Sequence, residues 1–272
     1  MSRIKQVTDN ARDTNHKLLI PYLVTGDPNL PSTVSLMHAL VEAGADIIEL
    51  GIPFSDPSSD GPVIQRGVER ALARGTQLKD VLATVKQFRQ DDSKTPVVLM
   101  GYLNPIEYMG YAAFTAAAVD SGVDGVLIVD MPPAESDELH SILQGAGIDT
   151  IYLVAPTTRE SRLQSICEHS SGYLYYVSLK GVTGAAISNF AEIEENILRL
   201  RAYTALPIVI GFGIKDGASA KAMAEISDGV IIGSALVEKI ALLVDQDSQD
   251  SADIVRTTEI IDLARQAIND IR

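Results

Sequence analysis

The chain of 272 residues lacks features that whole classes of protein require. Its one cysteine, Cys167, cannot form an internal disulfide, and its place in a helical pattern with Leu163 and Ile166 predicts a buried, inert thiol. No apolar run approaches the roughly 18 residues of a membrane span, and residues 1–17 are polar and mixed in charge rather than signal-like. We therefore expect a cytoplasmic protein without membrane contact or thiol chemistry.

Basic side chains are also scarce, since 22 Lys and Arg stand against 36 Asp and Glu and give a net charge of -14. This charge repels nucleic acid backbones and anionic lipids, so neither is an expected partner. The histidines show no metal-ligand spacing with cysteine or acidic neighbours, so we expect no metal site and assign none of them to catalysis. They are His16, His38, His140 and His169.

What the sequence does contain is a regular alternation of short β-branched runs with amphipathic helical stretches. This is the pattern of βα units that build one parallel sheet. Several runs are almost continuously apolar, as expected of strands that are covered on both faces. Eight runs are predicted as strands: Leu18–Val24, Asp46–Leu50, Val97–Tyr102, Gly125–Val129, Thr150–Val154, Tyr173–Ser178, Ile208–Gly211 and Val230–Ile232.

The segments between these runs carry helix signals and a repeated turn. Leu36, Met37, Leu40 and Val41 form one helix face, and Gly44 ends that helix before the next strand. The phrases Ala-Gly-Ala-Asp, Ser-Gly-Val-Asp and Gly-Ala-Gly-Ile-Asp precede the second, fourth and fifth runs. They predict one αβ turn that is used repeatedly.

Length and strand spacing together predict the fold class. With 46% hydrophobic residues, the chain can bury the core of a single domain over residues 1–272. Strand starts roughly 22 to 34 residues apart, with one longer gap before the third strand that must hold extra helix, match a (β/α)8 TIM barrel with additional N-terminal and loop helices. An open, doubly wound sheet is the alternative. Asp245–Ser251 is predicted as a loop and Ala252–Ile271 as the final helix.

One carboxylate lies near the end of the second predicted strand and another on the loop that follows it, at the barrel end where active sites form. Glu49 lies inside an apolar run, where burial raises a carboxyl pKa and suits general acid or base chemistry; a Glu tied to an Arg or a backbone amide is the alternative. Asp60 lies on the next loop, where it could supply the second of two distinct carboxylates or only satisfy loop amides. Asp56 could be a turn former or lie at a partner surface.

Glycine turns follow the last three strands and predict a phosphate site. They are Gly181-Val182-Thr183-Gly184, Gly211-Phe212-Gly213-Ile214 and Gly233-Ser234-Ala235. Phosphate sites in TIM barrels are commonly formed after strands seven and eight, where backbone N–H groups and a helix N-terminus point at the anion. Glycines also make tight turns, so a single pair would be weak support. Three at successive strand ends favour a phosphorylated substrate.

Distinctive motifs run along essentially the whole chain. They are Leu19-Ile20-Pro21-Tyr22, Thr25-Gly26-Asp27-Pro28, Glu49 through Pro57, Asp60-Gly61-Pro62 with Gln65, Met100-Gly101-Tyr102 with Asn104-Pro105, Asp130, Val154 through Thr158, Tyr176-Val177-Ser178, the three glycine turns and Asp228-Gly229-Val230. In these motifs the chain resembles the α subunit family of tryptophan synthase. The resemblance implies a lyase that splits indole-3-glycerol phosphate into indole and glyceraldehyde 3-phosphate by a retro-aldol route, without a cofactor in this subunit.

The resemblance also implies roles for individual residues. Glu49 would be the general acid and base, and Asp60, as an anion, would bind the indole N–H. Tyr175 would lie near Glu49, and Thr183 on a closing loop would bond Asp60. Backbone amides of Gly184, Gly213, Gly233 and Ser234 would hold the phosphate. The walls of the indole slot would be Tyr22, Met100, Leu127 and Leu153, each of which could equally be ordinary barrel core.

A protein partner is implied in the same way. The family works as an α2β2 complex in which indole passes to a β subunit that holds pyridoxal phosphate (PLP). The surface that would dock on the β subunit comprises Pro53, Asp56, Pro57, Asn104 and Pro105. Two departures bear on it: Ser58-Ser59 stands where the family usually has Leu-Ala, and Leu179-Lys180 stands where many members carry Arg first.

Three rival functions are open at this stage. One is an aldolase that forms a Schiff base through Lys180 or Lys215, both of which follow predicted strands. A second is a free-standing lyase that releases indole without a β subunit. The third is a barrel retained only to dock on and activate a partner.

Overall fold

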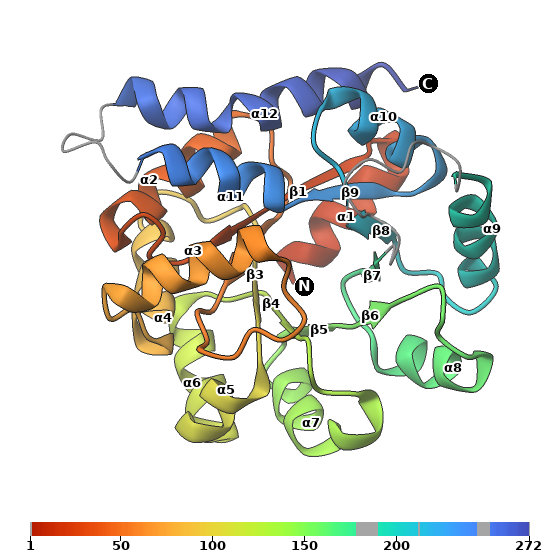
Figure 1. The fold of residues 1–272 in the computed structure, drawn as a ribbon. Helices are drawn as coiled ribbons and strands as arrows, with labels where there is room; N and C mark the ends of the chain where they lie inside the picture. The colour runs from red at the N-terminus through yellow and green to blue at the C-terminus, as the bar shows by residue number, and fades with distance from the viewer. Residues whose placement is uncertain (1, 178–189, 212, 244–250, 272) are drawn as a thin grey trace.

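The computed structural model describes residues 2–177, 190–211, 213–243 and 251–271. In these ranges one sheet of nine parallel strands curls into a nearly closed barrel with helices around its outside (Figure 1). The strands are β1 (Leu18–Val24), β2 (Ile48–Gly51), β3 (Val97–Gly101), β4 (Gly125–Ile128), β5 (Asp149–Ile151), β6 (Leu153–Val154), β7 (Leu174–Val177), β8 (Ile208–Gly211) and β9 (Gly229–Ile232).

The order of the strands identifies the fold class. Along the sheet it is β5-β4-β3-β2-β1-β9-β8-β7-β6, so the last strand pairs with the first. An open, doubly wound sheet would leave the two apart, and that alternative is therefore wrong. The predicted TIM barrel is confirmed, since eight successive βα units form one parallel ring.

One predicted strand is divided in the structure, and the others lie within two residues of their predicted bounds. The run Thr150–Val154 forms two short strands, because β5 pairs with β4 whereas β6 pairs with β7. Between them the carbonyl of Tyr152 accepts the Tyr175 N–H at 3.2 Å. The ring of hydrogen bonds is therefore interrupted at Tyr152, and the eight predicted strands become nine.

Helices cover the outside of the barrel, and both predicted additions to the basic fold are present. Two helices fill the long gap before β3, and one helix precedes β1. Within the described ranges, no helix combines the length and apolar character needed to cross a bilayer. The helices are α1 (Arg3–Thr14), α2 (Leu30–Glu42), α3 (Pro62–Ala73), α4 (Leu78–Phe88), α5 (Leu103–Met109), α6 (Tyr111–Ser121), α7 (Asp137–Gly145), α8 (Glu160–His169), α9 (Phe190–Arg201), α10 (Gly217–Ile226), α11 (Ser234–Ile240) and α12 (Ser251–Asn269), with 3-10 turns η1 (Pro133–Glu135) and η2 (Ala241–Leu243).

Two smaller predictions need correction. Cys167 is only partly buried, although burial does raise its pKa. Ser251 begins α12 instead of ending a loop, and residues 244–250 lie outside the described ranges. The predicted final helix is otherwise confirmed.

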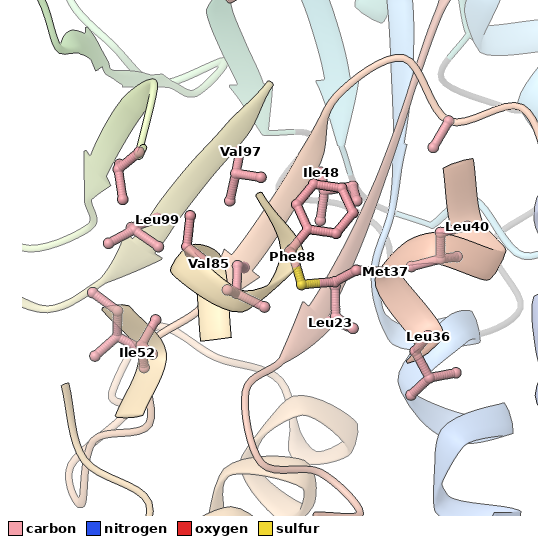
Figure 2. Close-up of a cluster of buried hydrophobic side chains, with 14 of the residues drawn as sticks. Leu23, Leu36, Met37, Leu40, Ile48, Ile52, Val85, Phe88, Val97 and Leu99 are labelled. Carbon is pink, nitrogen blue, oxygen red and sulfur yellow. The ribbon is translucent and has the colours of Figure 1, made fainter. Parts of the chain in front are cut away.

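The side chains of the strands alternate between an apolar cluster inside the barrel and apolar clusters outside it. Leu19 and Leu23 of β1 point outward and pack with α2 and α4, in the cluster that Figure 2 shows around Met37 and Phe88. The intervening residues Ile20, Tyr22 and Val24 belong to a second cluster that takes side chains from strands all around the ring. That second cluster is the barrel interior, and any polar side chain with the same parity points into it.

The repeated αβ turn predicted from sequence has a clear structural basis. Gly44, Gly122 and Gly147 all have positive φ, which ends each preceding helix. The Asp two residues later then joins neighbouring strands: Asp46 accepts the Leu19 N–H at 2.8 Å, and Asp124 accepts the Val97 N–H at 2.9 Å. Asp228 likewise accepts the Ile208 N–H at 2.8 Å, although no glycine stands two residues before it. The turns fix the strand starts, and hence the strand ends where the site lies.

Candidate active site

Glu49 lies on β2 with its side chain inside the barrel and is fully buried. The Tyr173 hydroxyl donates a hydrogen bond to its Oε1 at 2.6 Å. Its Oε2 is buried and has no hydrogen-bond partner among the described residues. Burial raises the pKa of Glu49 to about 7, and the Tyr173 hydrogen bond opposes part of this rise. Within the described ranges its partner is thus a tyrosine, not the Arg or backbone amide of the alternative prediction.

Asp60 lies on the loop between β2 and α3 and is half-buried. The loop fixes its backbone, since its N–H bonds Pro57 O at 3.0 Å and its carbonyl accepts Gln65 Nε2 at 2.8 Å. Burial raises the pKa of its carboxyl to about 6, and the hydroxyl of Tyr102 opposes this rise. Asp60 is still mainly an anion at neutral pH, as expected, but its pKa lies closer to that of Glu49 than a polar loop suggested.

The two carboxylates face the same space at the carboxyl end of the barrel. Tyr22, which pairs with Glu49 in the sheet register, and Tyr175 on β7 are both in or against the interior cluster. Burial raises the pKa of both phenols well above the usual value, and the charges of Glu49 and Asp60 raise them further. The charges of Glu49 and Asp60 thus act on the same two phenols, so the two predicted catalytic residues lie near one another.

Two glycines at strand ends make room for these tyrosines. A Cβ atom on Gly51, the last residue of β2, would collide with the Tyr22 hydroxyl. A Cβ atom on Gly211, the last residue of β8, would collide with the Tyr175 hydroxyl. The backbone of each strand thus lies directly against a phenol, which only glycine permits.

The four residues predicted to wall the slot all belong to the interior of the barrel. Tyr22 and Leu127 are buried members of the interior cluster, and Met100 and Leu153 are partly buried against it. In the sheet register Met100 pairs with Leu127, and Leu153 pairs with Tyr175. They line the same side of the sheet as Glu49, which suits a flat apolar ligand as well as a packed core.

Part of the predicted phosphate site can be located. Gly233 immediately precedes α11 and Ser234 begins it, and a Cβ atom on Gly233 would lie 3.6 Å from the Tyr22 ring. Gly213 follows the adjacent strand β8 with a φ of 74°, and no atom lies within 4 Å of where its Cβ would be. Both glycine turns therefore lie at the same end of the barrel as Glu49. Thr183 and Gly184 lie outside the described residues, as do Leu179 and Lys180.

The predicted partner surface is only partly exposed. Asp56 and Asn104 are exposed and Pro57 and Pro105 are partly so, but Pro53 is buried. Pro53 can therefore shape this surface but cannot form much of it. Lys215 is exposed on the loop before α10, whereas a Schiff-base lysine normally requires a desolvated pocket. In the described ranges, no three His, Cys, Asp or Glu side chains group as a metal site.

Sequence reasoning missed Tyr173, which bonds Glu49, and Tyr102, which bonds the loop that carries Asp60. Tyr173 lies two residues before Tyr175, so the alternation along a strand could have placed it in the interior beside Glu49. Tyr102 directly follows β3 on the active rim, and its hydroxyl accepts the Ser59 N–H at 3.0 Å. Position after a strand was a usable signal for Tyr102, but nothing in the sequence indicated which loop it would contact.

Comparison with known proteins identifies one family over most of the chain. The family model described as tryptophan synthase alpha chain matches residues 8–266. A tryptophan synthase alpha chain of Marinobacter nauticus is 51% identical over 273 residues, covering 100% of this chain and 99% of that protein. The tryptophan synthase subunit alpha structure from Legionella pneumophila has a TM-score of 0.92 and 44% identity, covering 100% of both chains. A chain from the tryptophan synthase α2β2 complex of Pyrococcus furiosus has a TM-score of 0.83 and 37% identity, covering 91% of this chain and 97% of its own.

Proposed function

The chain belongs to the tryptophan synthase alpha chain family, whose members cleave indole-3-glycerol phosphate, and we propose that Glu49 and Asp60 carry the reaction in this member. The reaction is a retro-aldol cleavage that gives indole and glyceraldehyde 3-phosphate. The observation that supports the assignment best is a fully buried carboxyl, Glu49, in the same space as a second, less buried one. Such a pair can hold different protonation states at neutral pH.

Glu49 acts as general acid and base in this proposal. Cleavage of the carbon–carbon bond requires a proton on the indole carbon that bears the glycerol chain, and removal of a proton from the adjacent hydroxyl. A pKa of about 7 allows one carboxyl to give and take protons near neutral pH. The Oε2 atom has no partner among the described residues, so it is available to the substrate.

Asp60 stabilises the positive charge that develops on the indole nitrogen. Protonation of the ring carbon draws electrons from that nitrogen, and an anion that accepts its N–H favours this state over the neutral substrate. With a pKa of about 6, Asp60 is mostly ionised at neutral pH while Glu49 is substantially protonated. The two carboxyls can therefore perform their separate roles at the same pH.

The substrate's phosphate would bind at the glycine turns after β8 and β9. The amides of Gly213, Gly233 and Ser234 lie at that end of the barrel, and Gly184 completes the predicted set. Each charge-assisted hydrogen bond from an amide contributes about 1.5–3 kcal/mol, so several can hold the anion without an arginine. Gly233 adjoins Tyr22, which would place the indole ring against Tyr22, Met100, Leu127 and Leu153.

A β subunit is the proposed partner, in an α2β2 complex that takes up the released indole. The Pyrococcus furiosus relative comes from such a complex, and Asp56 and Asn104 are exposed beside the active face of this chain. No cofactor is proposed in this subunit, and PLP would belong to the partner. The expected location in the cytoplasm stays a prediction from the sequence.

Indole release from indole-3-glycerol phosphate tests the assignment. Glu49→Gln and Asp60→Asn should each lower turnover by about two orders of magnitude or more while the circular dichroism spectrum stays native. Glu107→Gln, at an exposed carboxylate on α5, is the matched control and should retain activity. Near-normal turnover in either active-site variant would overturn its assigned role. Assays with and without a β subunit separate the rivals, since a docking-only barrel would release no indole in either case.

A further inference from the structure

The loop between β2 and α3, which carries Asp60, lies over a cavity of about 270 Å³. The cavity is lined by residues 54–58 of the loop and by Gln65, Val68, Glu69 and Leu72 of α3. Because this space separates much of the loop from the helix, close packing against α3 cannot fix the loop there. Its position depends instead on directed hydrogen bonds.

Gln65, in the first turns of α3, supplies such bonds. Its Nε2 donates to the carbonyl of Asp60 at 2.8 Å and lies 3.5 Å from the carbonyl of Pro57. Among the described residues, these are the hydrogen bonds that α3 side chains give to the loop. Both partners are carbonyl oxygens, so the side-chain amide must turn its nitrogen, which carries two protons, toward them.

The two carbonyls belong to the ends of one turn. The Asp60 N–H bonds Pro57 O at 3.0 Å and closes a β-turn over residues 57–60. Gln65 therefore holds both ends of this turn from the side of α3. From the side of β3, the Tyr102 hydroxyl accepts the Ser59 N–H at 3.0 Å. With its backbone held from two sides, the turn determines the direction in which the Asp60 side chain points.

Helix α3 is itself held firmly against the barrel. Arg70 donates from Nε at 2.8 Å and from Nη2 at 2.7 Å to the two carboxyl oxygens of Asp27, which is fully buried on the loop after β1. A Cβ atom on Gly67 would lie 3.0 Å from Asp27 Oδ2 and 3.0 Å from the side chain of Val237, so α3 also lies directly against α11 (Figure 1). Two-pronged Arg–carboxylate pairs are among the strongest side-chain contacts. A bond from Gln65 thus ties the turn to a fixed element.

We propose that Gln65 is a positioning residue for Asp60: by donating to the carbonyls of Asp60 and Pro57, its side-chain amide ties the turn to α3 and fixes the Asp60 carboxyl at the mouth of the barrel. This inference rests on the proposed function, in which Asp60 accepts the indole N–H. Gln65 acts through the backbone and leaves both carboxyl oxygens to the site. A displacement of about 1 Å in such a group can lower the rate about 100-fold.

Release of the turn would also change the surroundings of Asp60. Burial raises the pKa of its carboxyl to about 6, from an ordinary value of 3.8. A turn that moves away from the barrel exposes the carboxyl to water, so its pKa falls toward the ordinary value. Loss of the Gln65 amide should therefore move the acid limb of the kcat/KM profile to lower pH. A residue that only stabilises the fold would lower the amount of active enzyme and leave that limb in place.

The test is Gln65→Met, which keeps the length and helix propensity of the side chain and removes its donors. We expect kcat for indole release to fall about tenfold at neutral pH, KM to change less than about threefold, and the acid limb to move down by about one pH unit. Gln65→Ala removes the same donors with no new bulk, should act in the same direction, and serves if the Met variant fails to fold. Glu69→Gln, at an exposed side chain on the same cavity, is the control and should match the wild type.

A second measurement observes Asp60 without relying on turnover. In protein with carboxyl-¹³C aspartate, the Asp60 resonance is identified by its absence in Asp60→Asn. Its titration should move to lower pH in Gln65→Met and stay unchanged in Glu69→Gln. The NMR titration thereby reports whether the amide of Gln65 keeps the carboxyl in its buried place.

The outcomes separate this inference from the function on which it rests. If Asp60→Asn abolishes indole release but the Gln65 variants keep wild-type kcat, the positioning role is overturned and the function stands. A loss of kcat that is equal at every pH, with the Asp60 titration unmoved, would overturn it as well. If Asp60→Asn retains normal turnover, the proposed function of Asp60 is wrong, and the titration still decides whether Gln65 holds its carboxyl.

Discussion

At the scale of single residues, burial and hydrogen bonding act in opposite directions on the two carboxylates. Glu49 is fully buried and receives one phenol hydrogen bond, whereas Asp60 is half-buried and interacts with another phenol. Burial has the larger effect in both cases, so both pKa values rise, to about 7 and about 6. Each tyrosine lowers a pKa that burial would raise further. The tyrosines therefore adjust the pH at which the pair works.

The first prediction at this scale is a narrow bell-shaped dependence of kcat/KM on pH. Activity should fall as pH drops through about 6, because Asp60 becomes protonated, and fall again as pH rises through about 7, because Glu49 loses the proton it must donate. The two limbs of kcat/KM report the pKa values of the essential acid and base in the free enzyme. Initial rates of indole release in a buffer series at constant ionic strength provide the measurement. A profile that stays flat across this range would contradict the assignment.

The second prediction concerns the stability cost of Glu49. Its pKa is about 7 in the folded state against 4.5 as the ordinary value, so between these values the folded state binds the proton more tightly. Stability therefore decreases as pH rises through this window, by about 3 kcal/mol in total. Glu49→Gln removes the ionisable group and should stabilise the protein by up to this amount at about pH 8, with little effect at about pH 4.5. Urea unfolding at the two pH values measures the difference, and equal shifts at both would argue against a buried ionising carboxyl.

The sequence reveals the reacting residues more readily than the residues that tune them. Glu49 and Asp60 stand out because an acid in an apolar run is costly to bury and because a family motif contains both. Tyr173 and Tyr102 do not stand out, because tyrosine is ordinary in strands and their partners are 124 and 43 residues away. Such contacts depend on strand order around the ring, which no local pattern contains.

At the scale of elements, the αβ turn around Asp124 stabilises the fold more than its short sequence suggests. Asp124 is buried and accepts from the Val97 N–H, from Arg3 at 2.9 Å and from Arg89 at 2.7 Å. Arg89 in turn donates to the carbonyls of Gly122 and Thr95. One turn thereby links α1, α4, β3 and β4 at the end of the barrel opposite the site.

This network leads to a matched pair of substitutions. Asp124→Ala should destabilise the fold by about 3–5 kcal/mol, because it leaves the nearly buried Arg89 without its anion and the Val97 N–H without an acceptor. Asp120→Ala removes an exposed carboxylate that pairs with Lys86 at 2.7 Å and should cost about 0–1 kcal/mol. Chemical denaturation compares the two. Similar losses in both variants would show that the turn network contributes no more than a surface ion pair.

The sequence predicted where the strands lie but not every pairing between them. Apolar runs located all eight strands, because parallel strands covered on both faces read as continuous apolar sequence. The break at Tyr152 was not visible, because Thr150–Val154 shows no interruption in the sequence. Tertiary contacts produce it: the Tyr152 hydroxyl donates to Ser136 Oγ at 2.7 Å, and its ring packs edge-on to His169. The side chain of Tyr152 thus packs and hydrogen-bonds outside the barrel.

At the scale of the whole molecule, helix α1 closes the end of the barrel opposite the site. Ile4 is fully buried in the interior cluster and lies against Gly125 and Gly172, where Cβ atoms would come within 2.9 Å and 3.1 Å of its side chain. Ser2 and Arg3 bond Asp149 and Asp124 at the starts of two strands. The sequence predicted an additional N-terminal helix but not its position, because its apolar residues are few and its charged face resembles any surface helix.

The position of α1 implies that this helix belongs to the core. Ile4→Ala should lower the free energy of unfolding by about 2–5 kcal/mol, because glycines line the cavity it leaves and the strands around it cannot collapse without breaking the ring. Lys5→Ala on the exposed face of the same helix is the control and should change stability by less than about 1 kcal/mol. Urea denaturation followed by tyrosine fluorescence and by circular dichroism measures both variants, and the two probes should give one transition. If Ile4→Ala costs no more than Lys5→Ala, or if α1 unfolds in a separate earlier step, the helix is peripheral and the barrel is stable without it.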